Sequence, residues 1–217
     1  MIRRPPRSTL DRSSAASDVY KRQVLQSLSR PLSDQIVSPL VLFASSTSVY
    51  GQTDGSSVDE YSTTVPASFS GQTMLAAEAL VEEYLGPACS IRFGGIYGRG
   101  KSRLVSLLEA GEICPHEPAV ISNRIHSVDC CRIFMHLFRR YQAGQPLDCI
   151  YLAVDSQPTP LYEVMQWLAN KNSIPLASLK QGAASARGGN KRCLNHRLLS
   201  SGFSLQYPSF KEGFSDR

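Results

Sequence analysis

The chain has 217 residues, and 42% of them are apolar, which is typical of a folded domain and not of a disordered segment. Its formal net charge is +5, but six basic and only two acidic residues fall within the first 23, so the remainder is nearly neutral and gives no sign of a nucleic-acid-binding surface. The apolar runs, such as residues 39–44, are far shorter than the roughly 20 residues that a membrane-spanning helix requires.

The first 23 residues differ in character from the rest of the chain. The stretches MIRRPPRSTL and SAASDVYKRQ resemble sequencing-adapter DNA that has been translated as if it were coding. A targeting peptide is the alternative, but no apolar or amphipathic segment follows the basic residues. We therefore expect residues 1–23 to be an unstructured artefact that takes no part in the fold.

From residue 24 onward, short β-rich runs alternate with longer segments of helical period, which predicts a parallel sheet flanked by helices. We expect a strand at residues 41–43, a polar loop at 45–48, a helix through residues 74–85 that Gly86-Pro87 ends, and a second strand at 89–93. A glycine-rich turn at 94–100 should then lead into a helix that includes residues 104–108.

The clearest amphipathic helix is predicted at residues 130–141, where apolar side chains recur three and four positions apart. A buried strand at 149–154 follows. Thr159 is expected to cap a helix over residues 161–169, with Pro160 as its first helical residue. Residues 176–193 are predicted to be a loop.

The six cysteines show neither a C-x-x-C pair nor the spacing of a disulfide framework, so a reducing cytoplasm is the expected location. A zinc site formed by Cys114, His116, His126 and Cys130 is an alternative, but the ten residues that separate its pairs are not a characteristic zinc spacing. We expect no bound metal.

Several motifs appear in the order found in one enzyme family. The loop SSTSVYG at residues 45–51 is followed by RFGGIYG at 92–98, by IHSVD at 125–129, and by YLAVD at 151–155. In this order they resemble the extended short-chain dehydrogenase/reductases of the NAD-dependent epimerase/dehydratase group. The C-terminal segment, with NKR at 190–192 and YP at 207–208, is similar to the bacterial YeeZ-like branch.

This resemblance implies an α/β fold: the C-terminal part of a Rossmann-like parallel sheet with a small α+β substrate lobe. We expect residues 24–155 to form a partial NAD(P)-binding domain and residues 156–217 the substrate lobe. The implied activity is NAD(P)-dependent redox or epimerisation chemistry at a carbinol or sugar-like centre of a small molecule, with no nucleic-acid or membrane partner.

The resemblance also assigns roles to particular residues. Ser46 takes the place of the family's serine or threonine that contacts the reacting oxygen, and Ser45, Ser46, Gly94 and Gly95 are expected beside the nicotinamide end of NAD or NADP. Arg103, His126 and Arg192 are candidate substrate contacts.

The family's catalytic Tyr and Lys stand four residues apart on one helix, and here Ser70 and Met74 take those positions. A serine beside a thioether has no cation to lower its pKa, so ordinary dyad catalysis is not expected.

The family's Gly-x-Gly-x-x-Gly fingerprint is not found in this chain. We interpret the sequence as an N-terminally truncated fragment that binds NAD(P) weakly and is inactive as given, with the strand at residues 41–43 left as a sheet edge.

Two other classes remain open. A noncatalytic Rossmann-type sensor or interaction protein would explain the missing dyad. A phosphate-loop NTPase is also possible, because residues 95–102, GIYGRGKS, match that pattern between a predicted strand and a predicted helix.

Overall fold

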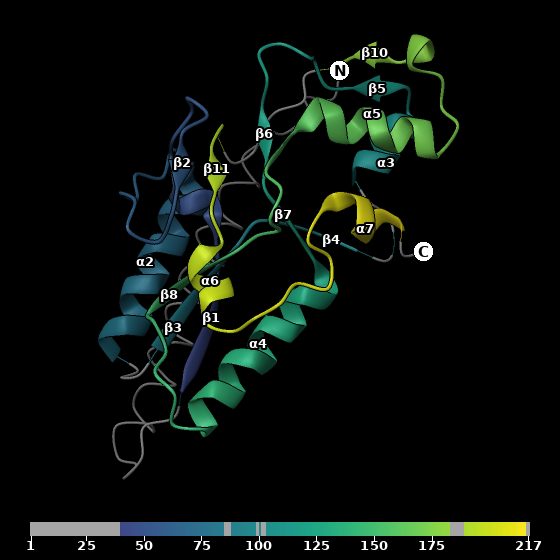
Figure 1. Ribbon diagram of the computed structural model, residues 1–217. Helices are drawn as coiled ribbons and strands as arrows, with labels where there is room; N and C mark the ends of the chain where they lie inside the picture. Colours follow the sequence, from purple (N-terminus) through teal and green to yellow (C-terminus); the bar gives the residue numbers. More distant parts are fainter. Residues whose placement is uncertain (1–39, 85–87, 99, 101–102, 183–188, 216–217) are drawn as a thin grey trace, which may run out of the picture.

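The computed structural model describes residues 40–84, 88–98, 100, 103–182 and 189–215 (Figure 1). Its strands are β1 (Val41–Ser46), β2 (Ser57–Val58), β3 (Ala88–Phe93), β4 (Gly95–Tyr97), β5 (Glu112–Ile113), β6 (Ile121–Ser122), β7 (Arg124–His126), β8 (Ile150–Ala153), β9 (Thr159–Pro160), β10 (Lys180–Gln181) and β11 (Arg192–Cys193). Its α-helices are α2 (Phe69–Tyr84), α3 (Arg103–Glu109), α4 (Ser127–Gln142), α5 (Leu161–Lys171), α6 (His196–Ser200) and α7 (Phe210–Ser215), with 3-10 turns η1 (Thr47–Val49) and η2 (Leu176–Ser178).

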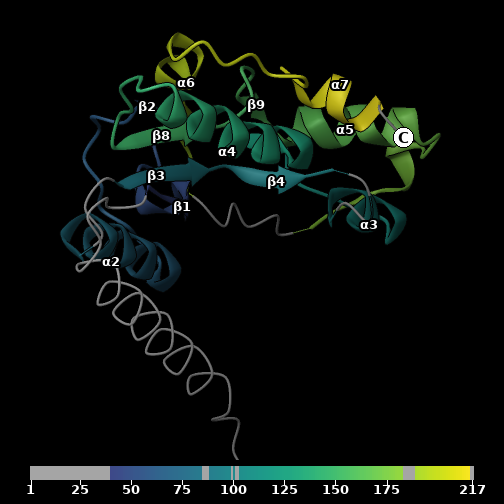
Figure 2. The ribbon, with the colours of Figure 1, turned by 90° about the horizontal axis from the view of Figure 1, so that it is seen from below.

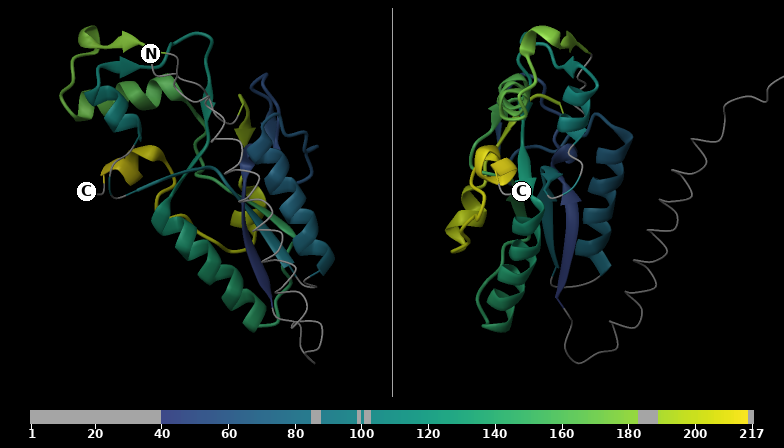
Figure 3. Two further views of the ribbon diagram at one scale, coloured as in Figure 1. Left: turned by 180° about the vertical axis from the view of Figure 1, so that it is seen from behind. Right: turned by 90° about the vertical axis from the view of Figure 1, so that its right-hand side faces the viewer.

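The central sheet is parallel and has the order β1-β3-β8. Val41 pairs with Ala88, and Ser90 pairs with Ile150. Helices α2 and α4 lie on opposite sides of these strands (Figure 3), which confirms the predicted α/β architecture. Within the described part of the chain, β1 forms one edge of the sheet, as expected. None of the described helices has both the length and the apolar character needed to cross a membrane.

β3 leads through Gly94 into β4, and the two strands follow one line (Figure 2). The Gly94 amide donates to Ala153 O at 3.0 Å, and the next amide, that of Gly95, donates to Asn123 O at 2.8 Å. The chain therefore passes from one pairing partner, β8, to another, β7. The predicted glycine-rich turn is wrong at residues 95–97, because pairing with the distant β7 makes them a strand; Arg99, Lys101 and Ser102 lie outside the described residues.

Other predicted boundaries also need correction. α2 begins at Phe69, earlier than the apolar spacing indicated, and the predicted stop at Gly86-Pro87 lies outside the described residues. Thr159 does not cap α5: it pairs in β9, its hydroxyl donates to Gln157 O at 2.9 Å, and Pro160 occupies the cap position. The span predicted as a loop, residues 176–193, contains η2, β10 and β11.

The buried side chains form separate clusters. One lies between the sheet and α4 and includes Ile91, Ile133 and Tyr151. Another fills the C-terminal lobe, where α3, α5 and α7 gather at one end of the molecule (Figure 1). This lobe takes α3 and β5 from before residue 155, whereas Leu198 of α6 packs in the sheet cluster. Packing thus crosses the predicted division at residue 155, and that division stays a prediction.

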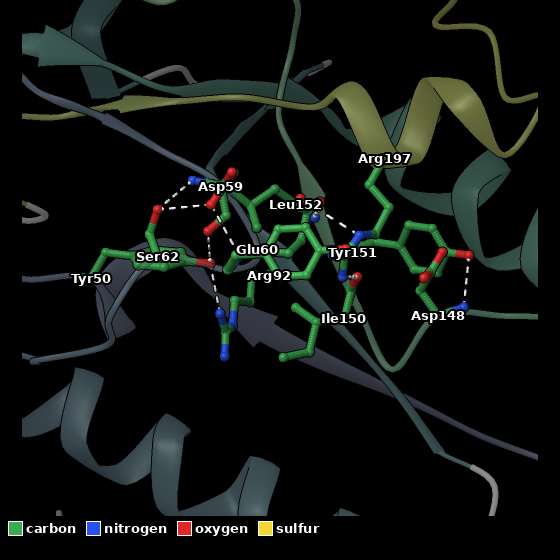
Figure 4. A network of polar contacts seen from close by, with 11 residues as sticks. Tyr50, Asp59, Glu60, Ser62, Arg92, Asp148, Ile150, Tyr151, Leu152 and Arg197 are labelled. Carbon is green, nitrogen blue, oxygen red and sulfur yellow. Dashed lines mark hydrogen bonds and ion pairs between the residues drawn. The ribbon is translucent and has the colours of Figure 1, made fainter.

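A buried polar network, which we call the Arg92 network, joins α2 to the sheet. Arg92 on β3 binds Glu78 on α2 with an Nη2–Oε2 distance of 2.7 Å, and its Nη1 donates to the Tyr50 hydroxyl at 2.6 Å. Ser45 on β1 donates its hydroxyl to the same Glu78 carboxylate. Tyr50 in turn donates to Asp59 O at 2.8 Å, as Figure 4 shows together with Arg92. The network therefore connects β1, β3, α2 and the loop after η1.

The segment that follows β2 covers the outer edge of β8. Glu60 accepts a hydrogen bond from the Leu152 amide at 2.8 Å, and its other carboxylate oxygen lies 3.9 Å from Arg197 Nε (Figure 4). Arg197 donates to Ile150 O at 3.0 Å. Side chains thus satisfy backbone groups at a strand edge that would otherwise be unpaired.

A second buried ion pair joins β7 to the end of β8. Arg124 Nε lies 3.9 Å from Asp155 Oδ2, and both side chains are almost fully buried. Burial raises the pKa of Asp155 from 3.8 to about 7, although the positive charge of Arg124 partly opposes this shift. Burial likewise lowers the pKa of Arg124. Desolvation therefore disfavours the charged form of each partner.

We predict that Glu78→Ala lowers the free energy of unfolding by about 3–5 kcal/mol, because it leaves the buried Arg92 guanidinium without its anionic partner. Glu82→Ala, one turn further along α2 at an exposed position, is the matched control and should change stability by less than about 0.5 kcal/mol. Urea denaturation followed by circular dichroism measures both. Equal losses in the two variants would contradict a special role for the Arg92 network.

Asp155 should make stability depend on pH. A carboxyl group whose pKa is higher in the folded protein than in the unfolded chain favours folding at low pH and loses that contribution as the pH rises. For Asp155 the loss falls between about pH 4 and pH 7. Compared with Asp155→Asn, the unsubstituted chain should lose about 2–4 kcal/mol across this window. Denaturation of both proteins at pH 4.5 and pH 7.5 tests this, and parallel pH profiles would disprove it.

Candidate functional site

A cavity of about 1090 Å³ lies beyond the ends of β1 and β3. Its volume is slightly above the range of about 300–1,000 Å³ that is usual for small-molecule sites. Its wall is formed by residues 46–48, 68, 70, 94–98, 103–104, 120–124, 127, 161, 189, 191 and 214. The carboxyl end of a parallel strand is where ligands bind in open α/β folds, so this cavity is the candidate functional site.

The serine loop, residues 45–48, supplies one wall of the cavity. Ser46 lines it, and its hydroxyl oxygen accepts a hydrogen bond from the Ser48 amide at 3.1 Å, which caps η1. Ser45 is buried on the opposite face of β1, where it binds Glu78, and it is not among the residues that line the cavity. Alternation of side chains along a strand separates these neighbours. Ser46 therefore reaches the cavity, and Ser45 supports it from behind.

Gly94 and Gly95 both line the cavity, as expected from the sequence. A Cβ on Gly94 would stand 2.9 Å from Val154 Cγ1 and 3.0 Å from Asn123 O, so close packing of the protein requires glycine there. At Gly95 the nearest atom to such a Cβ would be Asn123 O at 3.3 Å. Gly94 is therefore required by the packing of Val154 and Asn123 against the β3–β4 junction, and neither glycine places a side chain in the cavity wall.

The first turn of α2 supplies Ser70, which is exposed and lines the cavity. Met74, four residues later, is partly buried and packs against the cluster that contains Val49 and Leu152. A Cβ on Gly71 would lie 2.3 Å from Ser48 O, so α2 rests directly on the serine loop. The first turn of α2 thus brings a hydroxyl to the cavity, whereas the Met74 thioether packs into the protein interior.

Two tyrosines lie near the cavity, but neither is suited to lose a proton near neutral pH. Tyr97 lines the cavity and donates to Ser209 O at 3.3 Å, and burial raises its pKa. Burial also raises the pKa of Tyr50 to about 12, with Arg92 opposing the shift. Both phenols stay protonated and act as hydrogen-bond donors.

The three predicted substrate contacts lie in different environments. Arg103 lines the cavity at the start of α3. His126 is buried and accepts from the Val128 amide at 3.3 Å as the cap of α4, and its ring packs on Tyr207; it is not among the lining residues. Arg192 is exposed, donates to Gly55 O, and also lies outside the lining.

Two basic residues of the cavity wall, Lys191 and Arg124, were not among the residues predicted from the sequence. Lys191 is only 2% exposed, its ammonium donates to Tyr50 O at 2.8 Å, and burial lowers its pKa. The basic pair Lys191-Arg192 could have indicated a cavity residue, because neighbouring side chains in an extended chain point to opposite sides and only one of the two faces the cavity. The sequence alone favoured Arg192, and the structure places its neighbour in the wall.

The residues of the alternative zinc site do not form a ligand set. Among the residues that the structure describes, no group of three or more His, Cys, Asp or Glu side chains is placed to hold a metal ion. His116 instead packs edge-on against Tyr162, and Cys130 lies in the cluster between α4 and the sheet.

Comparisons with known proteins place this geometry in context. No family model matches the chain, and no curated protein does. Among solved structures, a protein from Methylobacillus flagellatus described as an NAD-dependent epimerase/dehydratase is 35% identical and has a TM-score of 0.69. The alignment covers 81% of this chain and 62% of that protein, so the chain spans less than two thirds of the relative.

More distant structures share the fold. DesIV, a dTDP-glucose 4,6-dehydratase from Streptomyces venezuelae solved with NAD bound, is 21% identical with a TM-score of 0.71, over 98% of this chain and 69% of that one. The human epimerase family protein SDR39U1, solved with NADPH, is 15% identical with a TM-score of 0.74, over 90% and 71%.

The motif order, the parallel sheet and the 35% identical structure agree with one another. Together they support a place for the chain among proteins like the extended short-chain dehydrogenase/reductases of the NAD-dependent epimerase/dehydratase group, to which it is similar in sequence and fold.

Proposed function

We propose that this chain is part of an NAD(P)-dependent oxidoreductase or epimerase-like protein that acts at a hydroxyl-bearing carbon of a small molecule. The observation that carries the proposal is the position of Ser46, whose side chain stands at the end of β1 in the wall of the 1090 Å³ cavity. Solved relatives described as NAD-dependent, or solved with NAD or NADPH, support the choice of cofactor.

The cavity fits the nicotinamide end of the cofactor. Gly94 and Gly95 leave the β3–β4 junction open, while Ser46 and Thr47 offer hydroxyls beside it. When bound, the nicotinamide would accept or supply a hydride at the reacting carbon. In this proposal the Ser46 hydroxyl hydrogen-bonds the nicotinamide end of the cofactor and, when substrate is bound, the reacting oxygen, and Ser45 holds the serine loop through Glu78.

The site lacks the tyrosine and lysine that transfer the proton in the family. Ser70 occupies the place of the family's tyrosine, and Met74 gives it no cation. A serine hydroxyl in that setting is a poor general acid or base near neutral pH. We therefore propose that the chain as given orients ligands and turns them over slowly or not at all.

The presence of Ser70 and Met74 in place of the tyrosine and lysine also supports a second candidate function, a noncatalytic Rossmann-type sensor or interaction protein. Such a protein would keep the cavity of the fold without the dyad. For an NTPase, residues 95–97 would have to wrap phosphate oxygens, whereas here they pair with β7 in a strand.

We also propose a cytoplasmic location, which agrees with six cysteines that are all free thiols.

The proposal predicts how the chain distinguishes parts of the cofactor. Reduced nicotinamide mononucleotide and NADH should bind with affinities within about threefold of each other, because the cavity receives the nicotinamide end and the chain has no glycine fingerprint for the pyrophosphate. Fluorescence titration of each nucleotide measures this. Ser46→Ala should weaken both by about tenfold, in keeping with the loss of one hydrogen bond.

Ser57→Ala serves as the control, since Ser57 is exposed on β2 and outside the cavity wall. Failure of either nucleotide to bind would refute the proposed function. Micromolar NADH binding combined with far weaker binding of the mononucleotide would instead show that the chain holds the pyrophosphate.

A further inference from the structure

Every charged side chain in the cavity wall is basic, within the part of the chain that the structure describes. The wall contains Arg103, Arg124 and Lys191, and neither an aspartate nor a glutamate is among its described lining residues. This contrasts with the near-neutral composition of the chain after residue 23. A cavity bounded by cations has a positive potential that favours an anionic ligand.

Arg124 on β7 is a buried cation that the protein holds loosely. It is 4% exposed, yet none of its three guanidinium nitrogens has a hydrogen-bond acceptor among the described residues. It lies 3.9 Å from Asp155 in an ion pair, and its Cζ lies 5.2 Å from the centre of the Phe210 ring. Buried donors without acceptors are costly. Arg124 therefore has donors in reserve for an anionic group.

Asp155 is a weak partner for this guanidinium. Its Oδ2, the oxygen that faces Arg124 Nε, accepts no hydrogen bond from the described residues, while its Oδ1 accepts from the Gln157 amide at 3.2 Å. Burial raises the pKa of Asp155 to about 7, so the charged form is only partly populated near neutral pH. An oxyanion bonded directly to the guanidinium would replace a long contact by charge-assisted hydrogen bonds.

The start of α4 lies in the same part of the cavity wall. Ser127, the first residue of α4, lines the cavity together with Arg124. The helix is 16 residues long, and the positive end of its dipole favours an anion there. Asp129 in the first turn is fully buried, and its carboxylate is already bonded to two backbone amides and to Arg132. Its charge is thus offset within the protein.

Binding requires the Arg124 side chain to turn toward the cavity, because its nitrogens are shielded from solvent in this structure. The turn breaks no hydrogen bond of the guanidinium with the described residues. It gives up only the long contact with Asp155 and the contact with the Phe210 ring. A ligand that bonds the turned side chain shifts the population toward that conformation.

We propose that Arg124 binds an oxyanion of the substrate, a carboxylate or a phosphate, where β7 meets α4, while the hydroxyl-bearing carbon lies at Ser46. This inference rests on the proposed function and narrows it to anionic hydroxy compounds. Asp155 holds the guanidinium until the ligand arrives and then releases it. An uncharged compound does not draw Arg124 from Asp155, so the pair selects substrates by charge.

Equilibrium dialysis of the full chain tests the proposal with two probes, labelled inorganic phosphate and labelled lactate. The ionic strength is held constant with chloride, and the pH is 8, where Asp155 is mostly charged. We expect saturable binding of at least one probe at one site per chain. Arg124→Gln should weaken it by about tenfold or more, as for the loss of charge-assisted hydrogen bonds. Arg139→Gln, at an exposed position in the last turn of α4, is the matched control and should change it by less than about twofold.

A second variant has the opposite expected effect and covers the case in which Arg124→Gln does not fold. Asp155→Asn removes the carboxylate that competes with the ligand for Arg124, so it should tighten binding of the probe by about three- to tenfold. General damage to the cavity would weaken binding instead. Unchanged or weaker binding by Asp155→Asn would contradict the proposal.

The preferred probe distinguishes a phosphate from a carboxylate substrate. Absence of binding by both probes overturns the proposal, as does binding that survives Arg124→Gln or falls equally in Arg139→Gln. Neither probe contains a nicotinamide, so anion binding at Arg124 in a chain that fails to bind reduced nicotinamide mononucleotide would refute the proposed cofactor site and leave the anion site standing.

Discussion

The pairing of Arg92 with Glu78 is the interaction on which the candidate site depends. A guanidinium buried on the central strand β3 needs an anionic partner, and the carboxylate that provides it comes from α2. That carboxylate also accepts a hydrogen bond from the hydroxyl of Ser45, while a second nitrogen of Arg92 donates to the hydroxyl of Tyr50. One buried charge pair therefore fixes the helix, the end of β1 and the loop beyond it, and with them the wall that bears Ser46.

Much of the fold could be predicted because its long elements carry their own signal. The apolar period of α4 and the apolar run of β8 indicate their burial directly, and β3 carries β-rich apolar residues on either side of Ser90 and Arg92. Short strands carry no such signal, since β4 is a strand only because β7 lies beside it, and β11 only because it pairs with β2. Their formation depends on contacts far apart in the sequence, so residues 95–97 looked like a turn.

The candidate site was predictable to the extent that the motifs mark strand ends. Ser46, Gly94, Gly95, Ser70 and Arg103 reach the cavity because each stands at the end of β1 or β3 or at the start of a helix beside them. Which of two adjacent residues faces a cavity depends on the strand face and on packing, and these separate Ser46 from Ser45 and Lys191 from Arg192. His126 was expected to contact substrate, but its ring packs on Tyr207 and caps α4.

The cavity of this chain keeps the family's scaffold and differs from it in the source of positive charge. In the family, a lysine on the helix beside the serine loop follows the catalytic tyrosine by four residues, whereas here α2 presents Ser70 and buries Met74. A cation still reaches the serine loop, because Lys191 approaches from the C-terminal segment and is held by Tyr50 O. Since Tyr50 belongs to the Arg92 network, the network that orients Ser46 also sets the position of the Lys191 ammonium. The orientation of the serine loop and the position of the Lys191 ammonium thus depend on the same buried charge pair, Arg92 with Glu78.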